Sequence, residues 1–135
     1  MLTRRGFAAC ALCAISGFTA TAAEAQSAAT SGGLKRTILG RIDGPVPGYE
    51  TIAVAVEIEP GAVIARHTHP GVESSEVLEG ETELQIAGEP SRKIGAGQVI
   101  QIQAGVPHGG KNGDKTTRIA ATYIVEKGKP LASPA

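Results

Sequence analysis

Short extended segments, each closed by glycine or proline, are the feature that most limits how this chain can fold. In Thr51–Glu59, branched apolar residues alternate with small or charged ones, as on a strand with one buried face. The apolar positions are Ile52, Val54, Val56 and Ile58. After the first 25 residues no stretch keeps a 3.6-residue apolar period. The pattern predicts a single all-β domain, built as a sandwich or a barrel.

Further candidate strands follow at short intervals through residues 34–130, which we expect to form one domain of about 100 residues. They are Ala62–His69, Ser75–Glu79, Thr82–Ala87, Ser91–Ile94, Val99–Gln103 and Thr116–Glu126. Turn signals such as Gly88-Glu89-Pro90 and Asn112-Gly113 separate several of them. Before the domain, the small residues 26–33 (QSAATSGG) predict a mobile linker. After it, residues 131–135 are expected to form a C-terminal tail.

Two histidines stand two residues apart at the end of one predicted strand. On an extended strand, the imidazoles of His67 and His69 would project to the same side. Pro70-Gly71 then turns the chain, and Glu73 follows early in the next extended run, where its carboxylate can return to the pair. The third histidine of the chain is His108. A single buried histidine is more often a hydrogen-bonded core residue than a ligand, but this combination favours a metal site.

The four candidate ligands belong to a double motif of fixed spacing. Its parts are Gly61-x5-His67-x-His69-x3-Glu73-x6-Gly80, then Gly97, then Gly105-x2-His108-x3-Asn112. The motif resembles that of the cupin superfamily, in particular its small single-domain, type-2-like members, over residues 51–125. The resemblance implies a double-stranded β-barrel, or jelly roll, with one divalent metal held by His67, His69, Glu73 and His108. Gln103 replaces a usual proline and Glu76 a frequent aromatic residue, and neither departure removes a ligand.

Three neutral imidazoles and one carboxylate suit Fe, Mn, Ni, Co, Cu or Zn, and the sequence does not choose among them. Four protein ligands on an octahedral ion leave two adjacent positions, which permits oxygenase, decarboxylase or isomerase chemistry. We therefore expect a small-molecule dioxygenase. One alternative is a non-catalytic protein that binds metal or a small ligand in the periplasm. The other is a structural dimer in which the metal only stabilises the fold. No further catalytic residue is indicated; Gln101 and Gln103 would line the pocket or face solvent.

The first 25 residues have the organisation of a signal peptide. Arg4 and Arg5 precede an uncharged stretch, Gly6–Ala23, and the segment ends in Ala23-Glu24-Ala25, an A-x-A cleavage signal. The twin arginine resembles the signal of the Tat route. This predicts a periplasmic or secreted protein that begins at Gln26 and has no membrane association after cleavage.

Charge and cysteine content limit the partners of the mature chain. Cys10 and Cys13 lie inside the apolar stretch of the signal, where lipid attachment at Cys10 is a minor alternative, so the mature chain has no disulfide. Removing Arg4, Arg5 and Glu24 from 13 basic and 13 acidic residues leaves a formal charge of −1. Without a basic cluster, a nucleic-acid partner is not expected. The expected partners are a small-molecule ligand or substrate and, from the cupin resemblance, a second copy in a homodimer.

Overall fold

A computed structural model describes residues 28–135, and the predicted signal peptide, residues 1–25, lies outside them. Within these residues the regular secondary structure consists of eleven strands and no helix. The strands are β1 Ala28–Ser31, β2 Leu34–Asp43, β3 Tyr49–Ile58, β4 Val63–Thr68, β5 Gly71–Glu79, β6 Glu81–Ile86, β7 Arg92–Gly95, β8 Val99–Ile102, β9 His108–Asn112, β10 Thr117–Glu126 and β11 Ser133–Pro134. Residues 28–135 include no helix long and apolar enough to cross a membrane.

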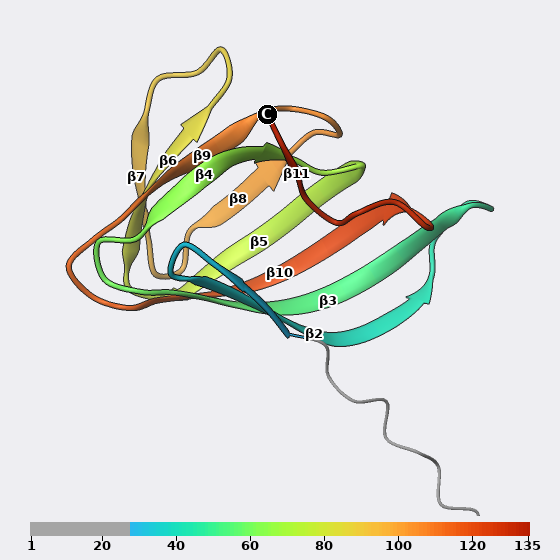
Figure 1. The fold of residues 1–135 in the computed structure, drawn as a ribbon, viewed down its shortest axis with the longest axis horizontal. Helices are drawn as coiled ribbons and strands as arrows, with labels where there is room; N and C mark the ends of the chain where they lie inside the picture. The colour runs from blue at the N-terminus through green and yellow to red at the C-terminus, as the bar shows by residue number, and fades with distance from the viewer. Residues whose placement is uncertain (1–27) are drawn as a thin grey trace, which may run out of the picture.

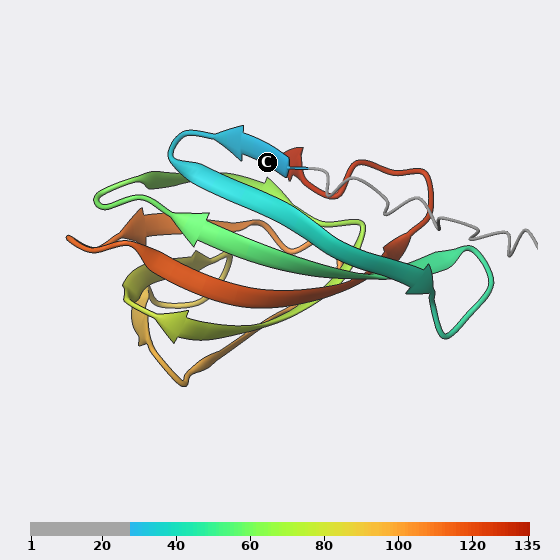
Figure 2. The ribbon, with the colours of Figure 1, turned by 90° about the horizontal axis from the view of Figure 1, so that it is seen from below.

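The strands form two antiparallel sheets that face each other (Figures 1 and 2). One sheet has six strands in the order β1-β2-β3-β10-β5-β8, and the other has five in the order β11-β4-β9-β6-β7. Some neighbours are consecutive strands, whereas others come from distant parts of the chain; β10, for example, lies between β3 and β5. This arrangement confirms the predicted all-β jelly roll.

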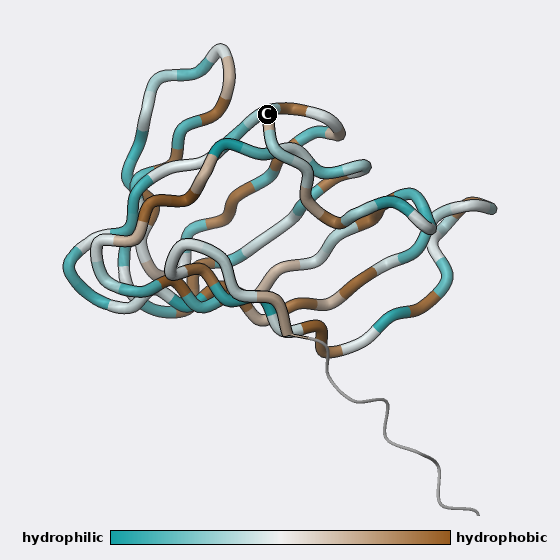
Figure 3. Tube along the Cα trace, viewed as in Figure 1, coloured by the Kyte–Doolittle hydropathy of each residue, from teal (hydrophilic) through white to brown (hydrophobic). Residues whose placement is uncertain are grey.

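The core lies between the two sheets and is supplied by alternate residues of the long strands. On β3 the four predicted apolar positions are all buried, and on β10 every second residue from Thr117 to Val125 is buried. Brown apolar segments accordingly alternate with paler ones along these strands (Figure 3). Because a period of two puts one set of side chains inside, the alternation in the sequence was sufficient to predict which face is buried.

All seven predicted strands are present, with ends shifted by at most four residues. The largest shift is in β5, which begins at Gly71, so Glu73 lies within the strand. Strands β2 and β9 are not among the candidates. β9 carries His108 and contains Gly109-Gly110, and glycine lowers strand propensity.

Two glycines allow neighbouring backbone segments to approach closely, one near the start of β10 and one in β9. Gly80, between β5 and β6, has a φ of +83°, and a Cβ there would lie 2.6 Å from the Thr116 carbonyl oxygen. A Cβ on Gly110 would lie 1.8 Å from the Glu83 carbonyl oxygen, closer than any real contact. Only glycine therefore lets β9 lie against β6 at this point.

The motif residue Asn112 has a structural role. Its buried amide nitrogen lies 2.9 Å from each of three carbonyl oxygens, those of Ile58, Glu59 and Lys115. Its side-chain oxygen accepts a hydrogen bond of 2.7 Å from the Thr117 hydroxyl. These contacts join the ends of β3, β9 and β10, and a buried polar group satisfied in this way stabilises the arrangement.

The segments expected to flank the domain belong to its sheets instead. The prediction of a mobile linker over residues 26–33 is wrong for Ala28–Ser31, because β1 pairs with β2 from Ala28↔Thr37 to Ser31↔Leu34. The C-terminal tail, residues 131–135, contains β11, which pairs with β4. Small residues bury little surface, but their backbone groups can still pair with a free sheet edge.

Candidate metal centre

The structure brings the three histidines together. His67 lies near the end of β4, His69 directly follows it, and His108 begins β9. His67 and His108 are directly opposite each other in the β4–β9 pairing. One ring nitrogen from each of the three lies within 4.8 Å of the other two. All three side chains are buried, with exposed fractions of 9%, 3% and 5%. The cluster can hold a metal ion.

Each imidazole is oriented by a backbone carbonyl. The Nδ1 to carbonyl oxygen distances are 2.8 Å from His67 to Ala65, 2.5 Å from His69 to Leu131, and 2.9 Å from His108 to Val106. A carbonyl oxygen only accepts, so each Nδ1 carries a proton and donates it. In the neutral ring this leaves the lone pair on Nε2, which is the arrangement found in metal-ligating histidines.

Glu73 supplies a buried carboxylate beside two of the imidazoles. Its Oε2 lies 3.0 Å from Nε2 of His69 and 3.5 Å from Nε2 of His108, and Ser75 donates a hydrogen bond of 2.7 Å to its Oε1. Burial raises the pKa of Glu73, but hydrogen bonds from His108 and His69, which need a proton on Nε2, and from Ser75 outweigh burial and hold the pKa well below its usual range. The carboxyl group is therefore ionised.

The contact between His69 and Glu73 shows whether the donor atoms of this site are suited to a cation. Nε2 of His69 is buried and has no hydrogen-bond partner, although Glu73 Oε2 is only 3.0 Å away. In the neutral tautomer fixed by Leu131, Nε2 of His69 presents a lone pair to the carboxylate, and the two atoms repel unless a proton or a metal ion lies between them. A divalent cation satisfies both atoms, so the donor set suits a metal.

Burial, opposed by the hydrogen bond to Ala65 and reinforced by the charges of His108, His69 and Arg36, lowers the pKa of His67 to about 4. Its ring is therefore neutral near pH 7, as a metal ligand requires. In the structure an Nη of Arg36, from β2, lies 3.3 Å from Nε2 of His67 and donates to it. The lone pair that a metal would use is thus held by a guanidinium.

Sequence reasoning missed two residues at this site, Arg36 and Tyr123. Tyr123, on β10, is buried, and its ring centroid lies 4.7 Å from that of His69. Burial raises the pKa of Tyr123, the charge of Glu73 adds to this effect, and the phenol stays protonated. Tyr123 has the strand parity of the core positions of β10, which could have indicated it. Arg36 had no such signal. Gln101 and Gln103 are exposed and do not line the cavity.

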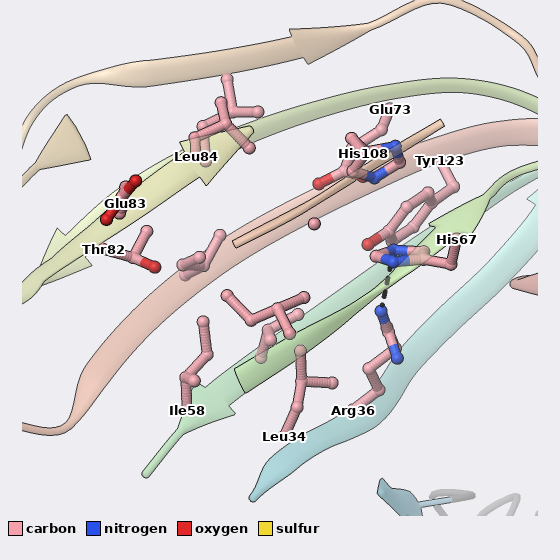
Figure 4. Close-up of a pocket in the computed structure, with 15 residues that line it drawn as sticks. Leu34, Arg36, Ile58, His67, Glu73, Thr82, Glu83, Leu84, His108 and Tyr123 are labelled. Atoms are coloured by element: carbon pink, nitrogen blue, oxygen red, sulfur yellow. Dashed lines mark hydrogen bonds and ion pairs between the residues drawn. The ribbon is translucent and has the colours of Figure 1, made fainter. Parts of the chain in front are cut away.

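The metal centre opens onto an inner cavity of about 60 Å³, which holds on the order of two water molecules. Figure 4 shows Arg36, His67, Glu73, His108 and Tyr123 around it. The rest of its wall is mainly aliphatic and includes Leu34, Ile58 and Leu84. The largely aliphatic wall lowers the local polarity, which strengthens electrostatic interactions among the polar groups of the site.

Comparison with known proteins gives one family match and many structural matches. Residues 54–128 match the family described as Cupin_2, cupin domain. No curated protein matches the chain.

Among solved structures, the chain is similar to an RmlC-like cupin from Shewanella frigidimarina, with 24% identity, a TM-score of 0.63, and coverage of 78% of this chain and 89% of that one. It is similar to the DMSP lyase DddQ from Ruegeria pomeroyi, with 25% identity, a TM-score of 0.57, and coverage of 63% and 43%. It is also similar to oxalate decarboxylase from Bacillus subtilis, with 13% identity, a TM-score of 0.66, and coverage of 81% and 30%. The chain thus spans less than half the length of these two enzymes.

Proposed function

The chain belongs to the Cupin_2 family, and from that premise we propose that it is a metal-dependent enzyme acting on a small oxygen-containing compound, with dioxygenase chemistry as the reaction to test first. The metal ligands in this proposal are His67, His69, Glu73 and His108. The observation that carries it is the buried contact between His69 Nε2 and Glu73 Oε2, two acceptors 3.0 Å apart. A divalent cation is the natural partner of such a pair.

A bound divalent ion would supply Lewis-acid polarisation of a substrate oxygen and, for Fe or Mn, one-electron chemistry. The chain's own residues supply the rest. Glu73 offsets part of the cation's charge, and its lowered pKa keeps it ionised near neutral pH. Tyr123 keeps its phenol proton and can donate a hydrogen bond to an oxyanion in the cavity. The aliphatic wall excludes water that would compete for the substrate.

The volume of the inner cavity limits what can reach the metal. A space of about 60 Å³ admits a carboxylate or a diol end but not a large planar ring. Two structural neighbours are named for small compounds, oxalate decarboxylase and DMSP lyase. These names agree with a small-molecule reaction, while the proposal rests on this chain's own site.

The test is a turnover assay with separately loaded Fe, Mn, Ni, Co, Cu and Zn protein. Oxygen consumption and product formation are followed over a panel of enediols, diketones and carboxylic acids. We expect at least one redox-active form to consume oxygen with one of these compounds. If compounds are converted without oxygen uptake, the protein is an enzyme of another class, such as a decarboxylase or isomerase. If every form binds compounds and converts none, it is a binding protein.

We also propose that the protein is exported to the periplasm and forms a homodimer. Export to the periplasm rests on residues 1–25, which carry Arg4 and Arg5. A homodimer is supported by the outer face of the six-stranded sheet, where Ala53, Ala120 and Thr122 are small and exposed. Such a face allows a second sheet to pack closely.

A further inference from the structure

A larger cavity adjoins the inner one. It has a volume of about 460 Å³ and runs between β2, β4 and the C-terminal tail. It shares Leu34, Arg36, Ile64 and His67 with the inner cavity, so these side chains lie at the boundary between the two. The volume is in the range of small-ligand sites. We call this larger cavity the outer groove.

The outer groove combines positive charge with aliphatic surface. Arg36 and Arg66 are the charged residues that line it, and no carboxylate does. Its apolar lining includes Leu34, Ile38, Val63, Ile64 and Leu131. A site with two guanidinium groups and an aliphatic wall selects a small organic anion over a neutral or cationic compound.

Arg36 lies where the outer groove meets the metal centre, and its charge is not neutralised there. Within residues 28–135, the arginines that form ion pairs are Arg41 and Arg118. The Nε of Arg36 is buried and has no hydrogen-bond partner. A partly buried guanidinium with an unused donor is costly unless a ligand satisfies it. A carboxylate matches the planar arrangement of guanidinium donors with two parallel hydrogen bonds.

The present partner of Arg36 is a metal ligand. An Nη donates to Nε2 of His67 at 3.3 Å, and a metal ion needs the same lone pair. The two uses exclude each other, so metal binding removes the His67 acceptor and leaves the Tyr123 hydroxyl as a neutral partner of Arg36 at the entrance to the inner cavity. The unused Nε–H and the uncompensated charge of Arg36 can then be satisfied by an anionic ligand.

We infer that Arg36 binds the carboxylate of the substrate, and that the substrate is a small carboxylate with a short aliphatic body that lies in the outer groove. The inference rests on the proposed metal site and narrows its substrate class. Arg66 is exposed at the outer rim and contributes mainly long-range attraction. The coupling is reciprocal: loading the metal strengthens carboxylate binding, and carboxylate strengthens metal binding.

The test uses zinc-loaded protein, which binds ligand without redox turnover. After zinc content is measured, acetate, butyrate, hexanoate and the neutral analogue butyramide are titrated by calorimetry into the unmodified protein and into Arg36→Gln, Arg36→Lys and Arg41→Gln. Arg41 is the matched control, because it is ion-paired with Glu50 at 2.8 Å and lines neither cavity. Melting temperatures establish that each variant is folded.

We expect butyrate to bind at least about tenfold more tightly than butyramide, and Arg36→Gln to lose at least about tenfold in butyrate affinity while keeping zinc. Arg36→Lys should lose less affinity than Arg36→Gln, because lysine keeps the positive charge but cannot donate the two parallel hydrogen bonds of a guanidinium. Each added methylene should strengthen binding by about fourfold, and Arg41→Gln should match the unmodified protein. If zinc is bound but Arg36→Gln keeps full preference for butyrate, the inference is overturned and the proposed function stands. If the unmodified protein binds no zinc, both fall.

Discussion

The Nδ1 of His69 donates a hydrogen bond to the backbone carbonyl of Leu131, 62 positions later in the sequence, at 2.5 Å. The C-terminal tail therefore orients a candidate metal ligand. Pairing of β11 with β4, through Ser133↔Thr68 and Pro134↔His67, holds the tail in place. The carbonyl fixes the tautomer of His69 in the way that outer partners of metal-bound histidines do.

Deleting residues 131–135 should weaken metal affinity by about 10- to 100-fold, because His69 loses the acceptor that orients it. Competition with a chelator of known affinity measures the change. Leu131→Ala is the matched control, since it removes the side chain and keeps the carbonyl, and its metal affinity should stay close to that of the full chain. Equal affinities in the truncated and full-length chains would show that the tail does not support the metal centre.

The metal-free protein should lose stability as the pH falls from about 6.5 toward 4. Burial lowers the pKa of His67 to about 4 in the folded chain, against an ordinary value of 6.5. Between these values the unfolded chain binds more protons, so the free energy of unfolding increases with pH over this window. Melting temperature followed across the range measures the effect. In His67→Ala the part of the slope that His67 contributes should disappear; an unchanged slope would argue against a buried neutral imidazole.

Glu73→Gln should weaken metal binding by at least about tenfold, because it replaces a buried ionised ligand with a neutral amide. In an enzyme most turnover should also be lost, whereas in a binding protein the loss should be confined to affinity and stability. Glu76→Gln is the control. Glu76 lies on the same strand, with its side chain exposed on the opposite face. Similar metal affinities for the two variants would exclude Glu73 as a ligand.

Replacing Arg4 and Arg5 with lysine should leave the protein in the cytoplasm, because the Tat route requires the arginine pair. Fractionation of cells with immunodetection measures the distribution. The exported form of the unmodified protein should begin at Gln26, as N-terminal sequencing would show. Undiminished export of the double-lysine variant would remove the Tat assignment and leave the signal peptide in place.

The strands that the sequence predicted are those with one buried face. In β3, four branched apolar residues alternate without interruption, and all four are buried in the core. The spacing of His67 and His69 likewise predicted that both rings face the same interior. In these cases a local repeat of two determines which side of the sheet each side chain occupies.

The features of the fold and of the site that the sequence did not predict depend on contacts between residues that are distant in the sequence or on backbone groups. Arg36 reaches His67 across 31 positions, because β2 joins the edge of β3 beside the metal centre. The partner of His69 is a backbone carbonyl, and every residue type has one, so no residue pattern identifies Leu131. The linker was mispredicted for a related reason, since β1 is held by backbone pairing while its side chains are all exposed.

The most direct test of the account is the metal content per chain, measured by mass spectrometry on protein purified from its native compartment. The account predicts about one divalent metal ion per chain, and near-complete loss, with a lower melting temperature, in His67→Ala and His108→Ala, because each removes a candidate ligand of the histidine cluster. Unmodified protein without metal, or histidine variants with the same metal content and melting temperature as the unmodified protein, would contradict it.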